Sequence, residues 1–349
     1  MRTFKSEDIR KLDALLLSAD RPVIVTHMRP DGDALGSSTG MFHALRAYQK
    51  HPVIVLMNPA PANLDFLLPE DVMRDVVIYE NDSTAAEKAI MDSDLVICLD
   101  FNALHRTDML ESPLLATKAP KILIDHHLSP DSEKFELMFS EQEISSASEL
   151  LYHILLELPA FYHNASALPA EAATALLTGM TTDTNNFANS VYPSTFSMAS
   201  ELISAGVDRD LILARLYNRF KESRIRLQGL MLNERMKITQ DGVAYMVLDK
   251  ETMVSYNVEE GDTEGFVNIP LTIGCVRMSI FVKEDDGYAR VSVRSKKGTS
   301  ANLCAKLHFH GGGHENAAGG RLFIPEDITD ISQAGSYIET VTHNFFKNE

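Results

Sequence analysis

The residues of this chain best suited to chemistry are carboxylates and imidazoles that follow apolar stretches. They occur at the ends of four separate stretches: His27, Asp31, Asp33, Asp100, Asp125, His126 and Asp183. Mixed carboxylate and imidazole ligands without thiolates suit manganese, magnesium, iron or zinc better than a structural cysteine-rich zinc site. The set is larger than one ion requires. It predicts a two-metal centre, with ions about 3.5–4 Å apart, that stabilises the attacking and leaving oxygens of a phosphoryl displacement.

Short strands must position most of these residues. The apolar run Lys121–Ile124 follows Pro120 and is too short for a helix, so it predicts a central strand of a parallel sheet. Functional residues in such sheets gather at the carboxyl ends of the strands. A single Asp after a strand is ordinarily a helix N-cap, and a single buried His is ordinarily a satisfied core residue. The coincidence of four such ends favours a functional site.

The spacing of apolar residues divides the chain into three parts. Strands and helices alternate over residues 1–190, which predicts a doubly wound parallel sheet of the α/β class. Residues 191–236 have a nearly continuous helical pattern and predict a helical connector. Residues 237–349 return to strands and predict a smaller α+β domain. In the first part we expect a helix to open at Ala34, where Gly36 can both let the backbone approach a ligand and pack the helix against the sheet.

A second group of residues, nearer the C-terminus, has the character of an anion site. Gly311, Gly312 and Gly313 precede His314, and the segment 311–320 is too glycine-rich to predict a helix or an interior strand. Consecutive glycines free the backbone to present several N–H groups to an anion, and a histidine adds a hydrogen bond or a charge. Upstream, a predicted strand ends in Arg294 and Ser295, which are suited to clamp a phosphate. A glycine run alone is equally typical of a flexible turn, so this interpretation depends on the metal centre.

Composition restricts the substrate and the compartment. A net charge of −17 and a pI near 5.1 argue against an extended basic groove for a long nucleic acid. Bound divalent ions can still attract a small phosphorylated substrate. Cys98, Cys275 and Cys304 are widely separated, which indicates neither a disulfide framework nor a thiolate site and fits a reducing cytoplasm. We expect no membrane partner, because neither a signal-peptide pattern nor a membrane-length apolar run is present.

Together these motifs resemble those of the DHH phosphoesterase superfamily, which is named for a sequence like Asp125-His126-His127. Its other motifs are similar to residues 27–37, to Asp100 with Arg106, to Thr182–Thr184 and, for the DHHA1 domain that accompanies it, to residues 311–319. The resemblance covers nearly the whole chain. In spacing, the chain is most similar to the bifunctional oligoribonucleases and pAp phosphatases of this superfamily.

The resemblance implies a ligand set and a catalytic set. One ion would bind His27, Asp31 and Asp100, and the other would bind Asp33, Asp100, His126 and Asp183, so that Asp100 bridges the two. Manganese is the expected ion, with magnesium or cobalt as alternatives. The residues implied in catalysis are Asp100, His127, Arg106 and Asp125. Among them, His127 would lie close to the scissile phosphate and Asp125 would support the ligands.

The resemblance also implies how substrate is held. The gripping residues would be Arg106, Arg294, Ser295, Gly311, Gly312, Gly313 and His314, with the DHHA1 domain facing the metals across a cleft. Phe101 stands where related sequences often carry threonine, a departure that changes none of the implied ligands. Phe187, shortly after Asp183, is expected to pack in the core rather than to stack a nucleobase.

The implied function is manganese-dependent hydrolysis of short oligoribonucleotides to mononucleotides, an exonuclease activity, together with removal of the 3'-phosphate of pAp. A phosphodiesterase for cyclic or linear dinucleotides, such as c-di-AMP or pApA, shares both domains and is the first alternative. A non-catalytic nucleotide-binding sensor is the second. An inorganic pyrophosphatase or exopolyphosphatase would share the metal centre, but pyrophosphatases of this superfamily carry a different C-terminal domain, and residues 311–320 argue against that alternative. RecJ-type DNA exonucleases need additional nucleic-acid-binding modules. We expect a cytoplasmic protein, and the oligomeric state stays open, with a homodimer among the expectations.

Overall fold

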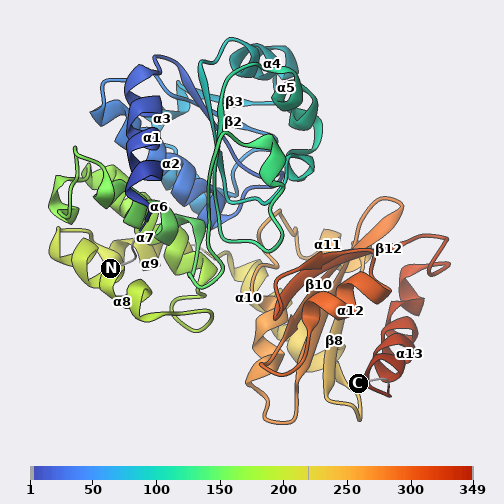
Figure 1. The fold of residues 1–349 in the computed structure, drawn as a ribbon. Coiled ribbons are helices and arrows are strands. Elements are labelled where there is room, and N and C mark those ends of the chain that lie inside the picture. The colour runs from blue at the N-terminus through green and yellow to red at the C-terminus, as the bar shows by residue number, and fades with distance from the viewer. Residues whose placement is uncertain (1–3, 219, 348–349) are drawn as a thin grey trace. The chain divides into compact units, whose positions relative to one another are not determined.

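The computed structural model describes residues 4–218 and 220–347 of the chain. The chain divides into two compact units, an N-terminal unit of residues 1–219 and a C-terminal unit of residues 220–349, coloured blue to yellow and yellow to red in Figure 1. The boundary falls within the stretch 191–236, and the separate helical connector expected there stays a prediction. In the described part of the chain, no helix combines the length and the apolar character needed to cross a membrane.

A parallel sheet of six strands forms the centre of the N-terminal unit. Its strands are β1 Pro22–Val25, β2 Val53–Leu56, β3 Val76–Ile78, β4 Leu95–Leu99, β5 Lys121–Asp125 and β6 Leu137–Ser140. Their order across the sheet is β3-β2-β1-β4-β5-β6, and all neighbours run parallel. The direction of winding reverses between β1 and β4, as in other doubly wound proteins. The predicted α/β class is confirmed, although the sequence pattern did not predict β6.

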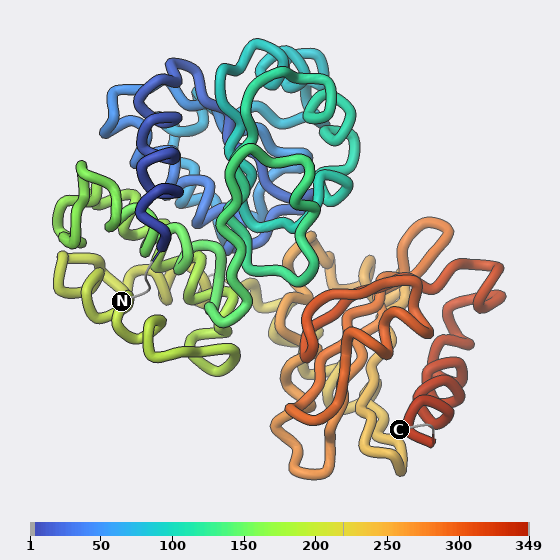
Figure 2. The backbone as a smooth tube through the Cα atoms, viewed as in Figure 1, coloured from blue at the N-terminus to red at the C-terminus, as the bar shows by residue number. Residues whose placement is uncertain are grey.

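Helices cover both faces of this sheet, because successive strand side chains point to opposite faces. They are α1 Ser6–Ser18, α2 Gly32–Ala47, α3 Glu70–Met73, α4 Ser83–Met91, α5 Glu111–Ala116, α6 Ala147–Glu157, α7 Ala170–Asp183, α8 Pro193–Ser204 and α9 Arg209–Tyr217, with 3-10 helices η1 Ala62–Leu67, η2 Leu104–Leu110, η3 Ser132–Lys134 and η4 Ala165–Ala167. Ile24 and Ile97 pack with α1, α2 and α6–α9, whereas Val25 and Cys98 pack with α4 and α5. Figure 2 shows α1 and the later helices α6–α9 on the same side of the sheet.

Glycines bring α2 and α7 into close contact. A Cβ atom added at Gly36 would lie 2.6 Å from Ala175 O and 2.7 Å from Gly179 Cα, so no larger residue fits there without movement of the helices. The prediction that Gly36 packs α2 against the sheet is therefore wrong, because this glycine packs α2 against α7. This helix pair carries Asp33 near its start on α2 and Asp183 at its end on α7.

The start of α2 also differs from the prediction. The helix begins at Gly32 rather than Ala34, because Asp31 acts as its N-cap. The Asp31 side chain accepts hydrogen bonds from the amides of Asp33 and Ala34, at 3.0 and 3.1 Å. Such a cap satisfies N–H groups that have no partner within the helix. Asp31 is thus a cap residue as well as a candidate ligand.

The C-terminal unit is an α+β unit built on a mixed sheet. Its elements are α10 Glu222–Leu230, a π-helical turn η5 Met231–Arg235, β7 Lys237–Ile238, β8 Val243–Leu248, α11 Lys250–Ser255, η6 Phe266–Thr272, β9 Met278–Glu284, β10 Tyr288–Ser295, α12 Ala301–His308, β11 Gly312–Gly313, β12 Ala317–Phe323, η7 Ile331–Gln333 and α13 Ala334–Lys347. The strand order is β11-β12-β10-β9-β8-β7. Within the described part of this sheet, β8 and β9 pair in parallel and the other neighbours pair antiparallel. Side chains of α12 and α13 complete its core, as the predicted α+β class requires.

The glycine-rich segment belongs to this sheet, and the prediction that it forms no interior strand is wrong. Strand β12 lies between β10 and β11 and pairs with both. A Cβ atom at Gly311 would lie 1.9 Å from Gly319 O, and one at Gly320 would lie 2.2 Å from Phe309 O. Glycine is needed here because two stretches of backbone approach each other closely.

Candidate metal centre

The candidate ligands gather at the carboxyl ends of β1, β4 and β5. His27 lies shortly after β1, Asp100 directly follows β4, and Asp125 is the last residue of β5. Because β1 and β4 are neighbours with opposite directions of winding on either side, their ends form the crevice where doubly wound proteins bind ligands. The sheet thereby brings together residues that are far apart in sequence.

His27, Asp31 and Asp100 form the first group, with potential ligand atoms all within 4.8 Å of one another. His27 Nε2 lies 3.5 Å from Asp100 Oδ2 and 3.8 Å from Asp31 Oδ1. The other ring nitrogen, Nδ1, lies 2.8 Å from Met28 O. Because a carbonyl oxygen can only accept, Nδ1 donates and Nε2 is the nitrogen that faces the carboxylates.

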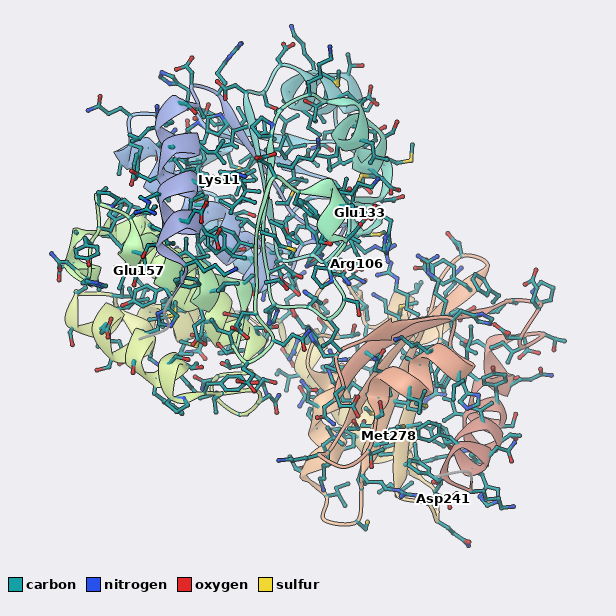
Figure 3. All side chains as sticks on the ribbon, viewed as in Figure 1. Lys11, Arg106, Glu133, Glu157, Asp241 and Met278 are labelled. Carbon is teal, nitrogen blue, oxygen red and sulfur yellow. The ribbon has the colours of Figure 1, made fainter. Side chains whose placement is uncertain are left out.

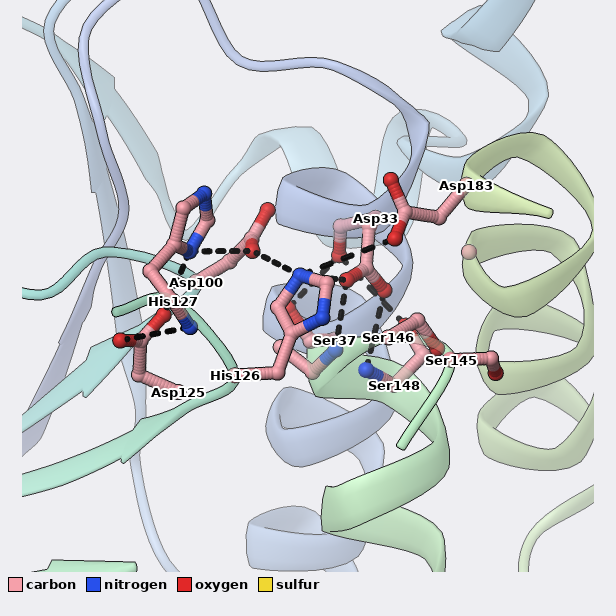
Figure 4. Close-up of polar contacts among 12 residues, drawn as sticks. Asp33, Ser37, Asp100, Asp125, His126, His127, Ser145, Ser146, Ser148 and Asp183 are labelled. Carbon is pink, nitrogen blue, oxygen red and sulfur yellow. Dashed lines mark hydrogen bonds and ion pairs between the residues drawn. The ribbon is translucent and has the colours of Figure 1, made fainter. Parts of the chain in front are cut away.

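Asp33, Asp100 and His126 form the second group, again within 4.8 Å. His126 Nε2 lies 3.5 Å from Asp100 Oδ1 and 3.9 Å from Asp33 Oδ2. Asp183 reaches the same imidazole from the end of α7, with Oδ2 at 3.6 Å from His126 Nε2 (Figure 4). Asp100 is common to both groups, since its Oδ2 faces His27 and its Oδ1 faces His126.

Backbone amides hold the carboxylate of Asp33. The Ala147 N–H donates to Asp33 Oδ2 at 2.6 Å, and the Ser148 N–H donates to Oδ1 at 2.9 Å. Both amides belong to the first turn of α6, where N–H groups lack partners within the helix and favour negative charge. Figure 4 shows Asp33 between this turn and His126. The orientation of Asp33 therefore depends on the start of α6.

Asp100 has a left-handed backbone conformation, with φ at 64°. For a residue with a Cβ atom this costs about 1–2 kcal/mol, and such strained residues cluster at functional sites. Its amide donates to Ile124 O on the neighbouring strand at 3.1 Å. Its Oδ1 atom is buried and accepts no hydrogen bond from the described residues. An acceptor buried in this way is available to a cation.

The two imidazoles and Asp100 shift one another's pKa values strongly. Burial lowers the pKa of His126, but the carboxylates of Asp100, Asp183 and Asp33 outweigh burial and raise that pKa to about 10. Burial also opposes charge on His27, whose pKa Asp100 and Asp31 nevertheless raise well above its ordinary value. Burial favours the neutral form of Asp100, yet its interactions with His126 and His27 hold its pKa well below the ordinary range.

The remaining carboxylates are crowded. Burial and then the charges of Asp100 and Asp183 raise the pKa of Asp33 well above its ordinary value. Burial also raises the pKa of Asp183, to about 6, against the opposing effect of His126 and with a further contribution from Asp100. The site combines oxygen and imidazole donors, an excess of negative charge, and a buried acceptor without a hydrogen bond. Divalent cations bind well to such a set of groups. The residues present can therefore hold metal ions.

Asp125 is fully buried and directs His127. Its Oδ1 lies 2.7 Å from His127 Nδ1, and its Oδ2 accepts the His127 N–H at 3.1 Å. His127 Nδ1 is also 3.8 Å from Asp100 Oδ1. Because the Asp125 carboxylate accepts a hydrogen bond from His127 Nδ1, the ring of His127 has a fixed orientation beside the Asp100 carboxylate (Figure 4).

Arg106 and Phe101 lie in the segment that follows Asp100. The Arg106 carbonyl accepts a hydrogen bond from the Met28 N–H at 2.9 Å, next to His27. Its side chain is exposed on the N-terminal unit, where Figure 3 labels it. Phe101 is fully buried in the core beneath the centre. The segment is thus held by the core at Phe101 and by the backbone next to His27 at Arg106, and the role of Arg106 toward substrate stays a prediction.

The predicted substrate-binding residues of the C-terminal unit lie on β10, β11 and the turn before β12. The Arg294 guanidinium donates to Val293 O at 3.0 Å and to Ala318 O at 3.2 Å. Ser295 Oγ donates to Thr299 O at 2.6 Å. The amides of this region are bonded as well: Gly313 N–H donates to Asn302 Oδ1 at 3.1 Å, and His314 N–H to Ala317 O at 2.8 Å. Their roles toward substrate stay predictions.

The sequence pattern missed the group of residues that supports Asp33. These residues lie at the start of α6, where Ser146 Oγ caps the helix by accepting the Glu149 N–H at 2.9 Å. A signal was present, since Ser146-Ala147-Ser148-Glu149 before an apolar run has the form of a capping box. Phe187, by contrast, packs as expected: its ring stacks on Phe196 at 5.4 Å and lies against the main core.

Comparison with known proteins agrees with this architecture. Residues 21–180 match the model of the DHH family, N-terminal domain, and residues 240–337 match the DHHA1 domain. The crystal structure of an exopolyphosphatase-related protein from Bacteroides fragilis has a TM-score of 0.90 and 36% identity, covering 99% of this chain and 98% of that one. Probable bifunctional oligoribonuclease and PAP phosphatase NrnA of Streptococcus mutans is 30% identical over 329 residues, 92% of this chain and 95% of the relative.

A relative of lower identity is named for another activity. Cyclic-di-AMP phosphodiesterase GdpP of Geobacillus thermodenitrificans is 26% identical over 96% of this chain but 49% of its own length. The fold and the cluster of carboxylates and imidazoles define an α/β protein with groups able to hold metal ions at its switch point. The chain belongs to the DHH family, with a DHHA1 domain following the DHH domain. Relatives in that family that are named as bifunctional oligoribonucleases and PAP phosphatases are 26–30% identical to it over 89–92% of this chain.

Proposed function

We propose that this protein is a two-metal phosphoesterase that hydrolyses short oligoribonucleotides to mononucleotides and removes the 3'-phosphate of pAp. The observation that carries the proposal is the sharing of Asp100 between two groups of ligand atoms, each within 4.8 Å. A carboxylate with one oxygen toward each group is suited to bridge two ions. The relatives of S. mutans and Thermus thermophilus named as oligoribonucleases and PAP phosphatases support the choice of substrate.

The ions are divided between the two groups. His27, Asp31 and Asp100 hold the first ion, and the second is held by Asp33, Asp100, His126 and Asp183. Two divalent ions, manganese by preference over magnesium or cobalt, supply positive charge that acidifies water and neutralises charge on phosphoryl oxygens. The excess of carboxylates and the buried Asp100 Oδ1 support this division.

The chain's own residues orient the reacting groups. Asp125 fixes His127 through Nδ1 and so sets the orientation in which the ring meets a phosphoryl oxygen. Asp100 Oδ1, 3.8 Å from His127 Nδ1, places negative charge beside the same ring. Arg106, exposed and anchored by its backbone beside the first motif, supplies positive charge to the scissile phosphate.

The C-terminal unit contributes the rest of the substrate site. Arg294, Ser295, His314 and the glycines Gly311, Gly312 and Gly313 bind the phosphate and sugar groups of the substrate. The net charge of −17 supports a short substrate over a long nucleic acid. We also propose a cytoplasmic location and keep the homodimer as a prediction.

The specific observation that favours a second function is the similarity to cyclic-di-AMP phosphodiesterase GdpP, which extends over 96% of this chain. A phosphodiesterase for cyclic or linear dinucleotides would use the same ions and the same carboxylates. It would differ only in which nucleotides the substrate site accepts. The chain spans about half the length of that relative, so this function stands second.

Product release from a panel of substrates distinguishes the two. The panel contains pAp, a linear diribonucleotide, a cyclic dinucleotide and pyrophosphate, each with manganese, with wild type and Asp100→Ala in parallel. We expect turnover of pAp and the diribonucleotide that is lost in the variant. Cleavage of the cyclic dinucleotide or pyrophosphate alone would overturn the substrate assignment. Absence of all turnover would favour a nucleotide-binding sensor.

A further inference from the structure

Glu149 is a fully buried carboxylate that the proposed reaction does not use. It lies in the first turn of α6, is 0% exposed, and forms no ion pair with a lysine or arginine among the described residues. Removing an ionised carboxylate from water is costly unless it is well hydrogen-bonded or paired. The Glu149 carboxylate therefore needs polar contacts that compensate for its removal from water.

Those contacts come from three sides. Glu149 Oε2 accepts hydrogen bonds from Ser145 Oγ and, at 3.2 Å, from the Ser145 N–H. The same oxygen accepts Thr195 Oγ–H at 2.7 Å. The other oxygen, Oε1, faces His153 Nε2 at 3.6 Å, one turn further along α6. Burial raises the pKa of Glu149, but these partners outweigh burial and lower that pKa to about 2, so the group is ionised.

On one side, these contacts fix the turn that holds Asp33. Ser145 precedes the cap residue Ser146, and the next two amides, of Ala147 and Ser148, hold both oxygens of Asp33. Figure 4 shows Ser145, Ser146 and Ser148 grouped beside Asp33. Release of Ser145 from Glu149 would free the residue immediately before this turn. The position of the Asp33 carboxylate is then less well defined.

On the other side, the contacts fix the chain that follows Asp183. Thr195 lies in the first turn of α8, and its Oγ1 also accepts the Tyr192 N–H at 3.0 Å. The residues from Thr184 to Tyr192 connect Asp183 to this point and include three consecutive positive φ angles, at Asn185, Asn186 and Phe187. A strained connection of this kind persists only where its surroundings hold it. Glu149 anchors its far end.

We propose that Glu149 is a positioning residue for the second metal ion, because it ties the turn that holds Asp33 to the chain that follows Asp183. The inference rests on the proposed function, in which Asp33 and Asp183 are ligands of that ion. Glu149 touches neither substrate nor ion. It sets the distance between two ligands that come from different helices, and mutation of such supporting groups typically lowers metal affinity by about 10–100-fold.

The test measures ion binding in metal-free protein by calorimetric titration with manganese, with wild type, Glu149→Ala and Glu149→Gln. We expect Glu149→Ala to weaken binding of the second ion by about 10–100-fold and to leave the first ion unchanged. Glu149→Gln retains an oxygen for Ser145 and Thr195 and presents an amide to His153, so it should restore part of the affinity.

A matched control lies in the same helix interface. Glu201 on α8 accepts a hydrogen bond from Tyr152 on α6 and, within the described part of the chain, forms no hydrogen bond with Ser145 or Thr195. Glu201→Gln should lower the thermal unfolding temperature of the metal-free protein and leave both ion affinities unchanged. If Glu149→Ala does not fold, Thr195→Val removes the hydrogen bond to Glu149, together with the one accepted from the Tyr192 N–H, and should weaken binding of the second ion several-fold.

The outcomes separate the inference from the proposed function. Wild type that binds two ions, with unchanged second-ion affinity in Glu149→Ala or in a folded Thr195→Val, overturns the positioning role alone. An equal loss of affinity in Glu201→Gln overturns it too, since general loosening of α6 and α8 would then explain the effect. Wild type that binds no second ion overturns the proposed function and this inference together.

Discussion

The two units present their candidate binding groups in opposite ways. In the N-terminal unit, buried side chains converge from strand and helix ends, and backbone amides hold one of them, Asp33, in place. In the C-terminal unit, glycines let backbone segments approach each other, and the polar groups lie along β10, β11 and the turn before β12. A cation site needs oxygen and nitrogen lone pairs from side chains, whereas an anion site can use the backbone N–H groups themselves. The first unit should therefore be sensitive to side-chain identity and the second to backbone shape.

The largest effect should follow removal of a buried imidazole from the first unit. His126→Ala removes the imidazole whose Nε2 lies 3.5–3.9 Å from carboxylate oxygens of Asp100, Asp33 and Asp183. We expect turnover of pAp to fall by about three orders of magnitude, because the second ion loses its nitrogen ligand. His105→Ala, at an exposed position of the same unit, is the control and should retain wild-type turnover. A loss below tenfold in His126→Ala would contradict the ligand assignment.

The second unit should respond to a single methyl group. Gly311→Ala places a Cβ 1.9 Å from Gly319 O, so the contact between this segment and β12 must open. We expect a loss of about 1–3 kcal/mol in the free energy of unfolding, as for other overpacked sites. Gly229→Ala in α10 meets no atom within 4 Å and should be neutral or slightly stabilising. Equal stability of the two variants in urea denaturation would refute the close-approach explanation.

A side chain of the second unit should affect substrate capture and spare the ions. We expect His314→Ala to raise KM for pAp by about tenfold, the loss of roughly one hydrogen bond to a charged group, with both ions retained. The neighbouring His310, which pairs with Asp327 at 3.1 Å, provides the control variant His310→Ala. Loss of bound manganese in His314→Ala would show that the two regions do not divide the work in this way.

The smallest effect is a pH dependence of stability. The pKa of Glu149 falls from an ordinary value of 4.5 to about 2 in the folded protein. A lowered pKa gives stability that is fully present above the unfolded value and is lost as pH falls through the folded value, so the window is about 4.5 to 2. Between pH 6 and pH 4, the stability advantage of wild type over Glu149→Gln should shrink by about 1 kcal/mol. Urea denaturation at both pH values measures it, and a growing advantage would contradict the sign.

Much of the N-terminal unit could be predicted because its signals are local. An apolar run that stops abruptly at Asp100 or Asp125 indicates both a buried strand and the end at which it meets solvent. Parallel pairing then places these ends together, whatever their separation in sequence. The set of candidate ligands follows from these ends, whereas its division into two groups is implied only by the resemblance to the DHH superfamily.

The remainder depends on partners that are distant in sequence. Strand β6 alternates buried and half-buried residues over four positions, too short a pattern to stand out. The glycines of β12 have the composition of a turn, and it is pairing with β10 and β11 that makes this segment a strand. Glu149 has the pattern of an ordinary capping residue, and its contact with Thr195 appears only when α6 and α8 pack together.

The central claim is that Asp100 is shared by two metal ions. Calorimetric titration of metal-free protein with manganese, for wild type and Asp100→Asn, tests it most directly. We expect two ions per chain in wild type and weakened binding of both in the variant, because each ion loses a carboxylate oxygen. One ion per chain in wild type, or loss of only one of two ions in Asp100→Asn, would contradict the shared-ligand account.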